Sequence, residues 1–203
     1  VMSEQIENGG SGVKVGMHVD ENEQAHVFAV TEDEQRQAAE KGNEYNLNTG
    51  TIAFSTNSST RTTLLYFKND EDADYIVTAI AVGLGTRSAT VSDAANVYVV
   101  RNPTAGTTIT NANNVDMNSN SNFGSANSLK TTTLVYKGAD GEGATTGGTE
   151  HGLLYMTDGR LFASLDIELP RGSSVAIEFD GNTSGSFNVY AALLGYVKDK
   201  KNK

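Results

Sequence analysis

Three histidines are the side chains of this sequence best suited to metal binding or proton transfer near neutral pH. His18 and His26 lie in two short runs of alternating apolar residues, and His151 follows a glycine-rich stretch. None has a serine or carboxylate at the spacing of a known catalytic motif. His18 and His26 would face each other if the two runs pair as a hairpin, which would supply two ligands of a metal site. Two solvated histidines are the simpler interpretation, because both have acidic neighbours.

Two acidic turns, residues 70–74 and 140–143, carry oxygen ligands of the kind that Ca²⁺ prefers. Neither has the spacing of a known calcium loop, so we interpret both as solvated turns. The segment 83–87 lacks the Lys-Ser/Thr ending of a phosphate-binding loop. The chain has no cysteine, which excludes thiol nucleophiles and thiolate metal sites. The sequence therefore predicts a non-enzymatic protein without a cofactor or a metal site.

The charge of the chain argues against nucleic acid as a partner. The formal net charge is −10, and phosphates would repel such a surface unless a basic patch were segregated on it. The one basic cluster, residues 198–203, is predicted to be a flexible terminal tail. No run approaches the roughly 18 to 20 apolar residues of a membrane span, and the acidic start does not resemble a cleavable signal peptide. We therefore expect neither a nucleic-acid nor a membrane partner.

From Tyr45 onward the sequence has the pattern of short strands separated by turns. Apolar residues make up 37% of the chain, and glycine is abundant with 21 residues, which suits short strands and many turns. Strand runs without helical periodicity between them favour an antiparallel sandwich. The runs are 47–54, 63–68, 75–84, 97–101, 107–110, 132–137, 152–157, 161–169, 174–179 and 186–197. The prediction is an all-β fold: a jelly-roll-like antiparallel β-sandwich over residues 45–197.

The first 44 residues are predicted to form an N-terminal arm. A polar, glycine-containing lead at 4–12 precedes a hairpin of the runs 13–19 and 25–30, and a short helix at 32–41 follows. Thr31 and Glu34 have the spacing of a capping box, and Gly42 is the expected stop. A two-stranded hairpin is marginal alone, so it should pack on the main body or on another subunit. The candidate interface residues are Val13, Val15, Met17, Val27 and Phe28.

Two further features bear on interactions. The runs 75–84 and 186–197 are apolar on both faces, which predicts that part of the outer surface meets a neighbour and that the protein self-associates as a homotrimer. The asparagine-rich segment 111–127 is too long for an ordinary connection and is therefore predicted to be functional or disordered.

Several segments between about residue 40 and residue 197 resemble structural proteins of tailed-phage virions, specifically small capsid proteins of the decoration or cement type. These segments are 40–50, 65–69, 101–107, 120–125 and 169–174. The resemblance implies a jelly-roll subunit, made in the host cytoplasm, that binds the major capsid protein on the outer surface of the virion. The hairpin and helix depart from a simple decoration module, which leaves a tail, fibre-base or neck position open.

A carbohydrate- or receptor-binding β-sandwich of a phage tail or fibre is the alternative from another class. Exposed aromatic side chains over a groove would favour it, because sugars stack on such rings. The chain has no tryptophan, the residue most used for that stacking, and this counts against the alternative.

Overall fold

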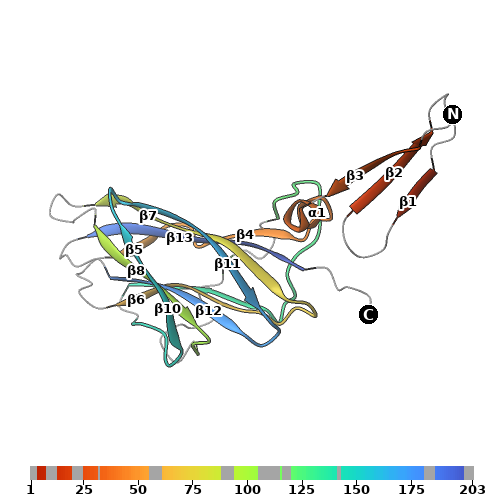
Figure 1. The fold of residues 1–203 in the computed structure, drawn as a ribbon. Helices are drawn as coiled ribbons and strands as arrows, with labels where there is room; N and C mark the ends of the chain where they lie inside the picture. The colour runs from red at the N-terminus through yellow and green to blue at the C-terminus, as the bar shows by residue number, and fades with distance from the viewer. Residues whose placement is uncertain are drawn as a thin grey trace.

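The computed structural model describes residues 4–7, 13–19, 25–31, 33–54, 61–87, 94–104, 115, 120–140, 143–180 and 186–198. Two antiparallel sheets face each other in the main body (Figure 1). The β7–β13 sheet has the order β11 (Arg160–Leu169), β7 (Tyr75–Arg87), β13 (Phe187–Val197) and β4 (Glu44–Asn48), and β5 (Ile52–Phe54) also pairs with β13. The β8–β12 sheet has the order β10 (Thr149–Met156), β8 (Ala95–Arg101), β12 (Ser174–Asp180), β6 (Thr62–Lys68) and β9 (Leu134–Lys137). The all-β prediction is confirmed.

The strand pairing is nested, as in a jelly roll. If the short strands β5 and β9 are set aside, the first strand of the sandwich pairs with the last, the second with the second to last, and so on inward. The four pairs are β4 with β13, β6 with β12, β7 with β11, and β8 with β10. This order follows when a long antiparallel ribbon is rolled into two facing sheets. It makes β10 and β11, which are consecutive in the chain, the edge strands on one side of the sandwich.

The core lies between the two sheets and is built by alternate residues of each strand. On β12, Val175, Ile177 and Phe179 face inward and are almost fully buried. Phe187 at the start of β13 stacks on Phe54 with ring centroids 5.1 Å apart and meets Phe179 of the opposite sheet at 5.8 Å. Aromatic contacts of this kind stabilise a sandwich beyond the burial of area alone.

The predicted run 47–54 is two strands rather than one. Gly50 adopts a positive φ of 63°, and its backbone N–H donates to the Asn48 side chain at 2.7 Å. Thr49 fills the gap in the ladder, since its hydroxyl accepts from the backbone N–H of Ala191 at 3.0 Å. The chain therefore bends between β4 and β5 while both stay paired with β13. The predicted run 107–110 lies outside the described residues.

The helix forms where it was predicted, but its cap is different. α1 spans Glu34–Glu40, and Asp33 is its N-cap, accepting from the backbone N–H of Gln35 at 3.1 Å. Thr31 is not the cap, because it ends β3 and pairs there with Val13. The helix is the only one in the described part of the chain, and it is far too short to cross a membrane.

Ahead of the helix stands a small antiparallel sheet, the arm sheet, with the order β1 (Glu4–Glu7), β2 (Val13–Val19) and β3 (Ala25–Thr31). The predicted hairpin is confirmed as β2 and β3. The strand β1 was missed because the segment 4–7 contains one apolar residue, Ile6, and so has no visible alternation. In Figure 1 the arm sheet stands beyond α1, away from the sandwich.

Tyr75 is the buried polar group of the core that lacks a partner. Its ring lies 4.6 Å from that of Phe67, and its hydroxyl has no hydrogen-bond partner in the described structure. Burial raises the pKa of the Tyr75 phenol well above its ordinary value, and the nearby Tyr45 and Glu44 add to the effect. An unpaired buried hydroxyl destabilises the folded state.

Tyr75→Phe should therefore raise the free energy of unfolding at pH 7 by about 1 kcal/mol. A pKa raised by folding leaves stability unchanged below the unfolded value and lowers it as pH rises past that value. The variant should thus also lose stability less steeply above about pH 10. Urea titrations at several pH values would measure both effects. An equal or lower stability at pH 7, with an equally steep alkaline fall, would contradict the assignment.

Candidate functional site

The arm sheet has one almost entirely apolar face, set by its register. Ile6 pairs with Val15, Val15 with Ala29, and Met17 with Val27. Because paired residues share a face and alternate residues lie on the same side of a strand, these positions form one surface. This apolar face consists of Ile6, Val13, Val15, Met17, Val19, Ala25, Val27 and Ala29, with Glu4 and Thr31 at its edges.

The structure brings together four of the five predicted interface residues. Val13, Val15, Met17 and Val27 lie on the apolar face, whereas Phe28 pairs with Gly16 on the opposite face. The sequence pattern did not separate Phe28 from the others because the run 25–30 is apolar at most positions. The pairing register decides on which face Phe28 lies, because neighbouring residues of a strand lie on opposite faces of the sheet.

The opposite face of the arm sheet carries both hairpin histidines. His18 pairs directly with His26, as expected from the hairpin. The same face holds Gln5, Glu7 and Lys14 at other register positions. In the part of the chain that the structure describes, no group of three or more histidines and carboxylates is placed to hold a metal ion.

Helix α1 fixes the base of the arm on the sandwich. Ala38 packs in a small apolar cluster with Ile76 of β7 and Tyr196 of β13, on the outer face of the β7–β13 sheet. The Gln35 side chain donates to Glu44 at 2.6 Å, which ties the first turn of the helix to β4. The chain that leaves α1 toward the arm sheet therefore starts from a defined position.

The asparagine-rich segment holds the other end of the helix. The side-chain amides of Asn120, Asn122 and Asn127 donate to carbonyl oxygens of residues 40–42, two of them at 3.0 and 3.1 Å. The last carbonyls of a helix have no partner within it, so these amides satisfy them. Residues 120–127 of the segment that was predicted to be functional or disordered therefore have an anchoring role, and Val115, the other described residue of the segment, is buried in the core.

The acidic turn at residues 70–74 is held by protein groups rather than simply solvated. Glu71 is buried and accepts from the Thr133 hydroxyl at 2.9 Å, and Asp70 accepts from Arg171 at 3.0 Å. Carboxylate oxygens that are engaged in this way stabilise the turn. Our interpretation of a solvated turn was wrong here, and the turn closes one end of the sandwich.

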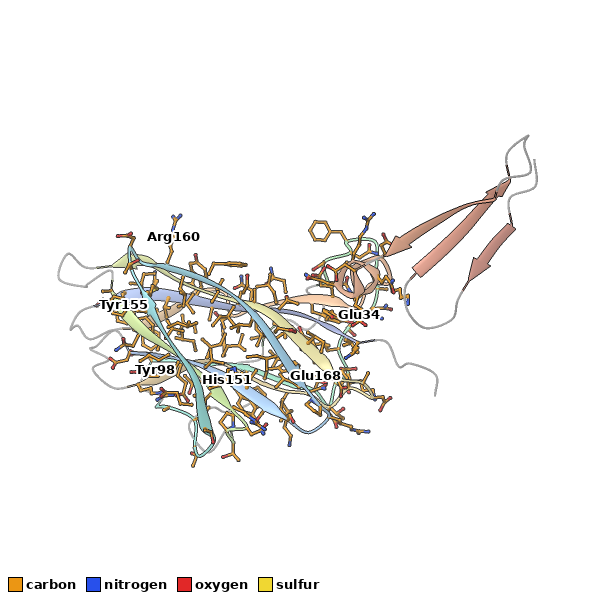
Figure 2. The ribbon with its side chains drawn as sticks, in the orientation of Figure 1. Glu34, Tyr98, His151, Tyr155, Arg160 and Glu168 are labelled. Carbon is orange, nitrogen blue, oxygen red and sulfur yellow. The ribbon has the colours of Figure 1, made fainter. Side chains whose placement is uncertain are left out.

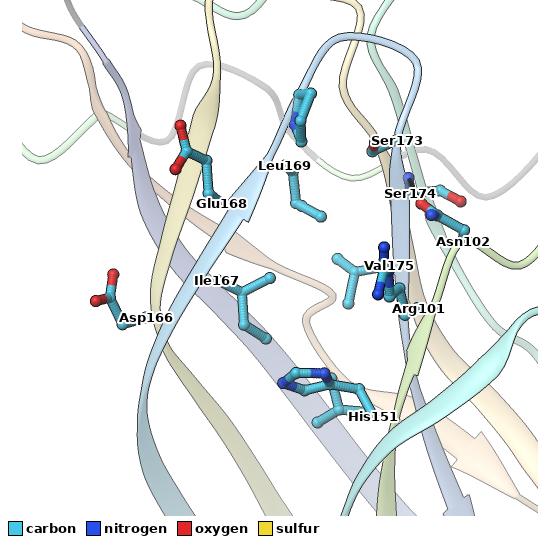
Figure 3. Close-up of a pocket in the computed structure, with 12 residues that line it drawn as sticks. Arg101, Asn102, His151, Asp166, Ile167, Glu168, Leu169, Ser173, Ser174 and Val175 are labelled. Carbon is cyan, nitrogen blue, oxygen red and sulfur yellow. Dashed lines mark hydrogen bonds between the residues drawn. The ribbon is translucent and has the colours of Figure 1, made fainter.

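The described residues that come nearest to a catalytic grouping line a cleft between the edge strands β10 and β11. His151 and Arg101 lie on one wall, and Asp166 and Glu168 come from β11. Figure 3 shows both carboxylates projecting from the far side of β11, away from His151. Glu168 lies 3.5 Å from the Lys198 ammonium on that outer side. The described residues of the cleft thus form no histidine–carboxylate pair for proton transfer.

Tyr155 and Phe162, the exposed aromatic residues of the two edge strands, do not share a groove. Tyr155 is 63% exposed on the outer face of β10, and Phe162 is 66% exposed on β11. The strands belong to different sheets, and their outer faces point to opposite sides of the sandwich. The pair therefore offers no joint platform on which a sugar ring would stack.

Comparison with known proteins leaves the chain without a family: no family model matches it, and no curated protein does.

Proposed function

We propose that this chain is a non-enzymatic structural protein of a tailed-phage virion, a capsid decoration or cement protein that binds and stabilises the lattice of the major capsid protein. The observation that carries the proposal is the apolar face of the arm sheet. Eight apolar residues share that face, and the sheet stands away from the core of the sandwich (Figure 1). A surface of this kind on an extended arm is typical of a docking element.

The apolar face of the arm sheet calls for a partner. A sheet that is hydrophobic on one face must bury that face against another element. Fully burying a Val, Ile or Met side chain contributes about 1.5 to 3 kcal/mol. The face includes six such residues. Docking would therefore contribute several times that free energy, from which the entropic cost of association must be subtracted. A ligand that binds only the assembled lattice stabilises that lattice by mass action.

The charge of the arm defines the partner surface. Residues 1–44 carry ten acidic residues against three basic ones, a net charge of −7. A complementary surface would be an apolar groove bordered by lysine or arginine side chains. We propose that neighbouring major capsid proteins supply it.

Self-association as a homotrimer is part of the same proposal. The outer face of the β7–β13 sheet carries an apolar patch beyond the end that α1 covers, with Phe162, Ala81, Ala192 and Leu194 on adjacent strands. Symmetric association is the common way to cover such a surface. Sedimentation equilibrium that gives only a 21.5 kDa species at micromolar concentration would contradict this part.

A pair of neighbouring substitutions tests the docking face. Val27→Asp places a carboxylate on the apolar face, and His26→Asp places one at the next position of β3, on the opposite face. Because a charge buried in an apolar interface is strongly unfavourable, Val27→Asp should weaken binding to capsids that lack the protein by at least about tenfold. His26→Asp should bind as the unaltered chain does.

Co-sedimentation of each variant with such capsids, over a range of protein concentrations, measures the difference. Both substitutions lie outside the sandwich, so both proteins should keep the same β circular dichroism spectrum. Equal binding by the two variants would show that the face assigned from the register is not the docking face.

A further inference from the structure

The cleft between β10 and β11 has the size and lining of a small binding site. Its volume is about 360 Å³, within the range of pockets that hold small ligands. Its floor is apolar, and Figure 3 shows Ile167 and Leu169 pointing from β11 toward the opposite wall. Val99 and Val175 complete the floor from the β8–β12 sheet. The cleft lies at the sandwich edge that β10 and β11 form.

A guanidinium, that of Arg101, lies on the wall of this cleft opposite β11, in a chain whose net charge is −10. His151 lies on the same wall. Asp166 and Glu168 also belong to the lining, but Figure 3 shows their carboxylates projecting from the other side of β11. Arg36, Arg61 and Arg171 are ion-paired, but Arg101 has no ion-pair or hydrogen-bond partner for its side chain among the described residues. An unpaired guanidinium above an apolar floor is suited to a planar anion.

Backbone features fix the positions from which Arg101 and His151 project. His151 is the extra residue of a β-bulge, because the pairing of β10 with β8 shifts between Glu150 and Gly152. Bulges redirect a side chain and are common beside binding sites. Asn102, which follows Arg101, adopts a positive φ of 49° and is held to Ser174 by two backbone-directed hydrogen bonds of 2.8 and 3.2 Å.

A glycine secures the same segment from the other side. A side chain at Gly148 would come within 2.8 Å of the Arg101 carbonyl and 2.9 Å of Pro103, and this glycine has a φ of 82°. The loop before β10 can therefore lie directly against Arg101 and Pro103. A binding group on so well-supported a segment loses little conformational freedom when a ligand arrives.

We propose that this cleft binds a carboxylate carried on a small organic body, with Arg101 holding the carboxylate, His151 donating a hydrogen bond to it, and the apolar floor contacting the body. A guanidinium matches the two oxygens of a carboxylate with two parallel hydrogen bonds. This chemistry fits two sources, an acidic sugar or the free C-terminus of a peptide. The proposal does not depend on capsid binding, because the cleft lies on the sandwich and not on the arm sheet.

Two matched pairs of probes distinguish the sources. Glucuronic acid is compared with glucose, and N-acetyl-glycyl-leucine with its C-terminal amide. Chemical-shift titration of the ¹⁵N-labelled full chain should show saturable changes at the amides of residues 99–102 and 150–152 with at least one acid, at concentrations up to about 10 mM. The neutral partner of that acid should cause no such changes.

Two substitutions test whether the acid binds at Arg101. Arg101→Met should weaken the binding of the responding acid by about tenfold or more, because it removes the charged hydrogen bonds and keeps the length of the side chain. Arg160→Met is the matched control, since Arg160 is exposed, lies outside the cleft (Figure 2) and is likewise unpaired among the described residues. It should leave the affinity unchanged.

Three outcomes would overturn the proposal. They are no response to either acid, equal responses to an acid and its neutral partner, and undiminished binding by Arg101→Met in a protein whose spectrum is otherwise unaltered. A response to the sugar acid alone, or to the peptide acid alone, supports the proposal and identifies the source of the carboxylate.

Discussion

Arg61→Ala should lower the free energy of unfolding by about 3 kcal/mol, a large effect for a surface-facing side chain. Glu178, in the middle of β12, is 2% exposed and carries a carboxylate. Arg61 pairs with it through Nε, and Thr145 donates to it from its backbone N–H at 2.8 Å and from its hydroxyl. Removing Arg61 leaves a buried charge without its counterion, which is strongly unfavourable.

The estimate is at the lower end of the range for broken buried pairs because the Arg61 side chain is 31% exposed. The arginine also lies 3.8 Å from the centre of the Tyr98 ring and 3.0 Å from a Glu150 oxygen, so the substitution removes packing as well as charge. Glu178 and Tyr98 are paired across β12 and β8, which places the whole group on the outer face of the β8–β12 sheet.

Urea unfolding followed by circular dichroism measures this prediction. Arg160→Ala is the control, and it should change stability by less than about 0.5 kcal/mol because its side chain is exposed and unpaired in the described structure. The double variant Arg61→Met with Glu178→Leu should recover much of the loss, since it removes both charges together. A loss of less than about 1 kcal/mol for Arg61→Ala would show that Glu178 is satisfied without its arginine.

Much of the sandwich could be predicted because its signal is local. Five strands can be predicted from dense runs of β-branched and apolar residues that are bounded by Asp-Gly, Asn-Asp and Pro-Arg-Gly turns. They are β6, β7, β11, β12 and β13. The end of α1 at Glu40 is predicted by Gly42, which lies just beyond the C-cap Lys41 and adopts a φ of 73°. Each of these features depends on a few neighbouring residues.

The remaining features depend on pairings between distant residues. In the sequence, Glu178 is a single polar residue in the predicted strand run 174–179. Only its contact with Arg61, 117 residues earlier, shows that it belongs to an ion pair and is buried. The sequence indicates only a loop for the asparagines of residues 120–127. Their anchoring role could not be predicted, because their partners at residues 40–42 lie about 80 positions away. The cleft between β10 and β11 could not be predicted either, because its lining comes from β8, β10, β11 and the start of β12.

The arm lies between these two cases. Alternation predicts that residues 13–19 and 25–30 are strands, but it does not give the register, and the register places Phe28 opposite to the other four candidate residues. It also does not reveal β1, whose contribution to the apolar face is the single residue Ile6. The sequence therefore predicts a docking arm, and the register of the structure is needed to propose which face of the arm docks.

Deletion of residues 1–31 should abolish capsid docking and spare the sandwich. The cut keeps Asp33, which caps α1, and the contacts of Ala38 with Ile76 and Tyr196. The truncated protein loses all eight residues of the apolar face. Since each large side chain that docking buries contributes about 1.5 to 3 kcal/mol, the loss of several at once exceeds the roughly 2.7 kcal/mol that corresponds to a hundredfold change in affinity.

The most direct measurement is a binding isotherm of the full chain and of the truncated chain on capsids assembled without this protein, together with the temperature at which the decorated capsids open. The account predicts saturable binding and a raised opening temperature for the full chain. For the truncated chain it predicts an affinity at least about a hundredfold lower, no change in the opening temperature, and an unaltered β spectrum. Equal affinity and equal protection by both chains would contradict the assignment of docking to the arm sheet.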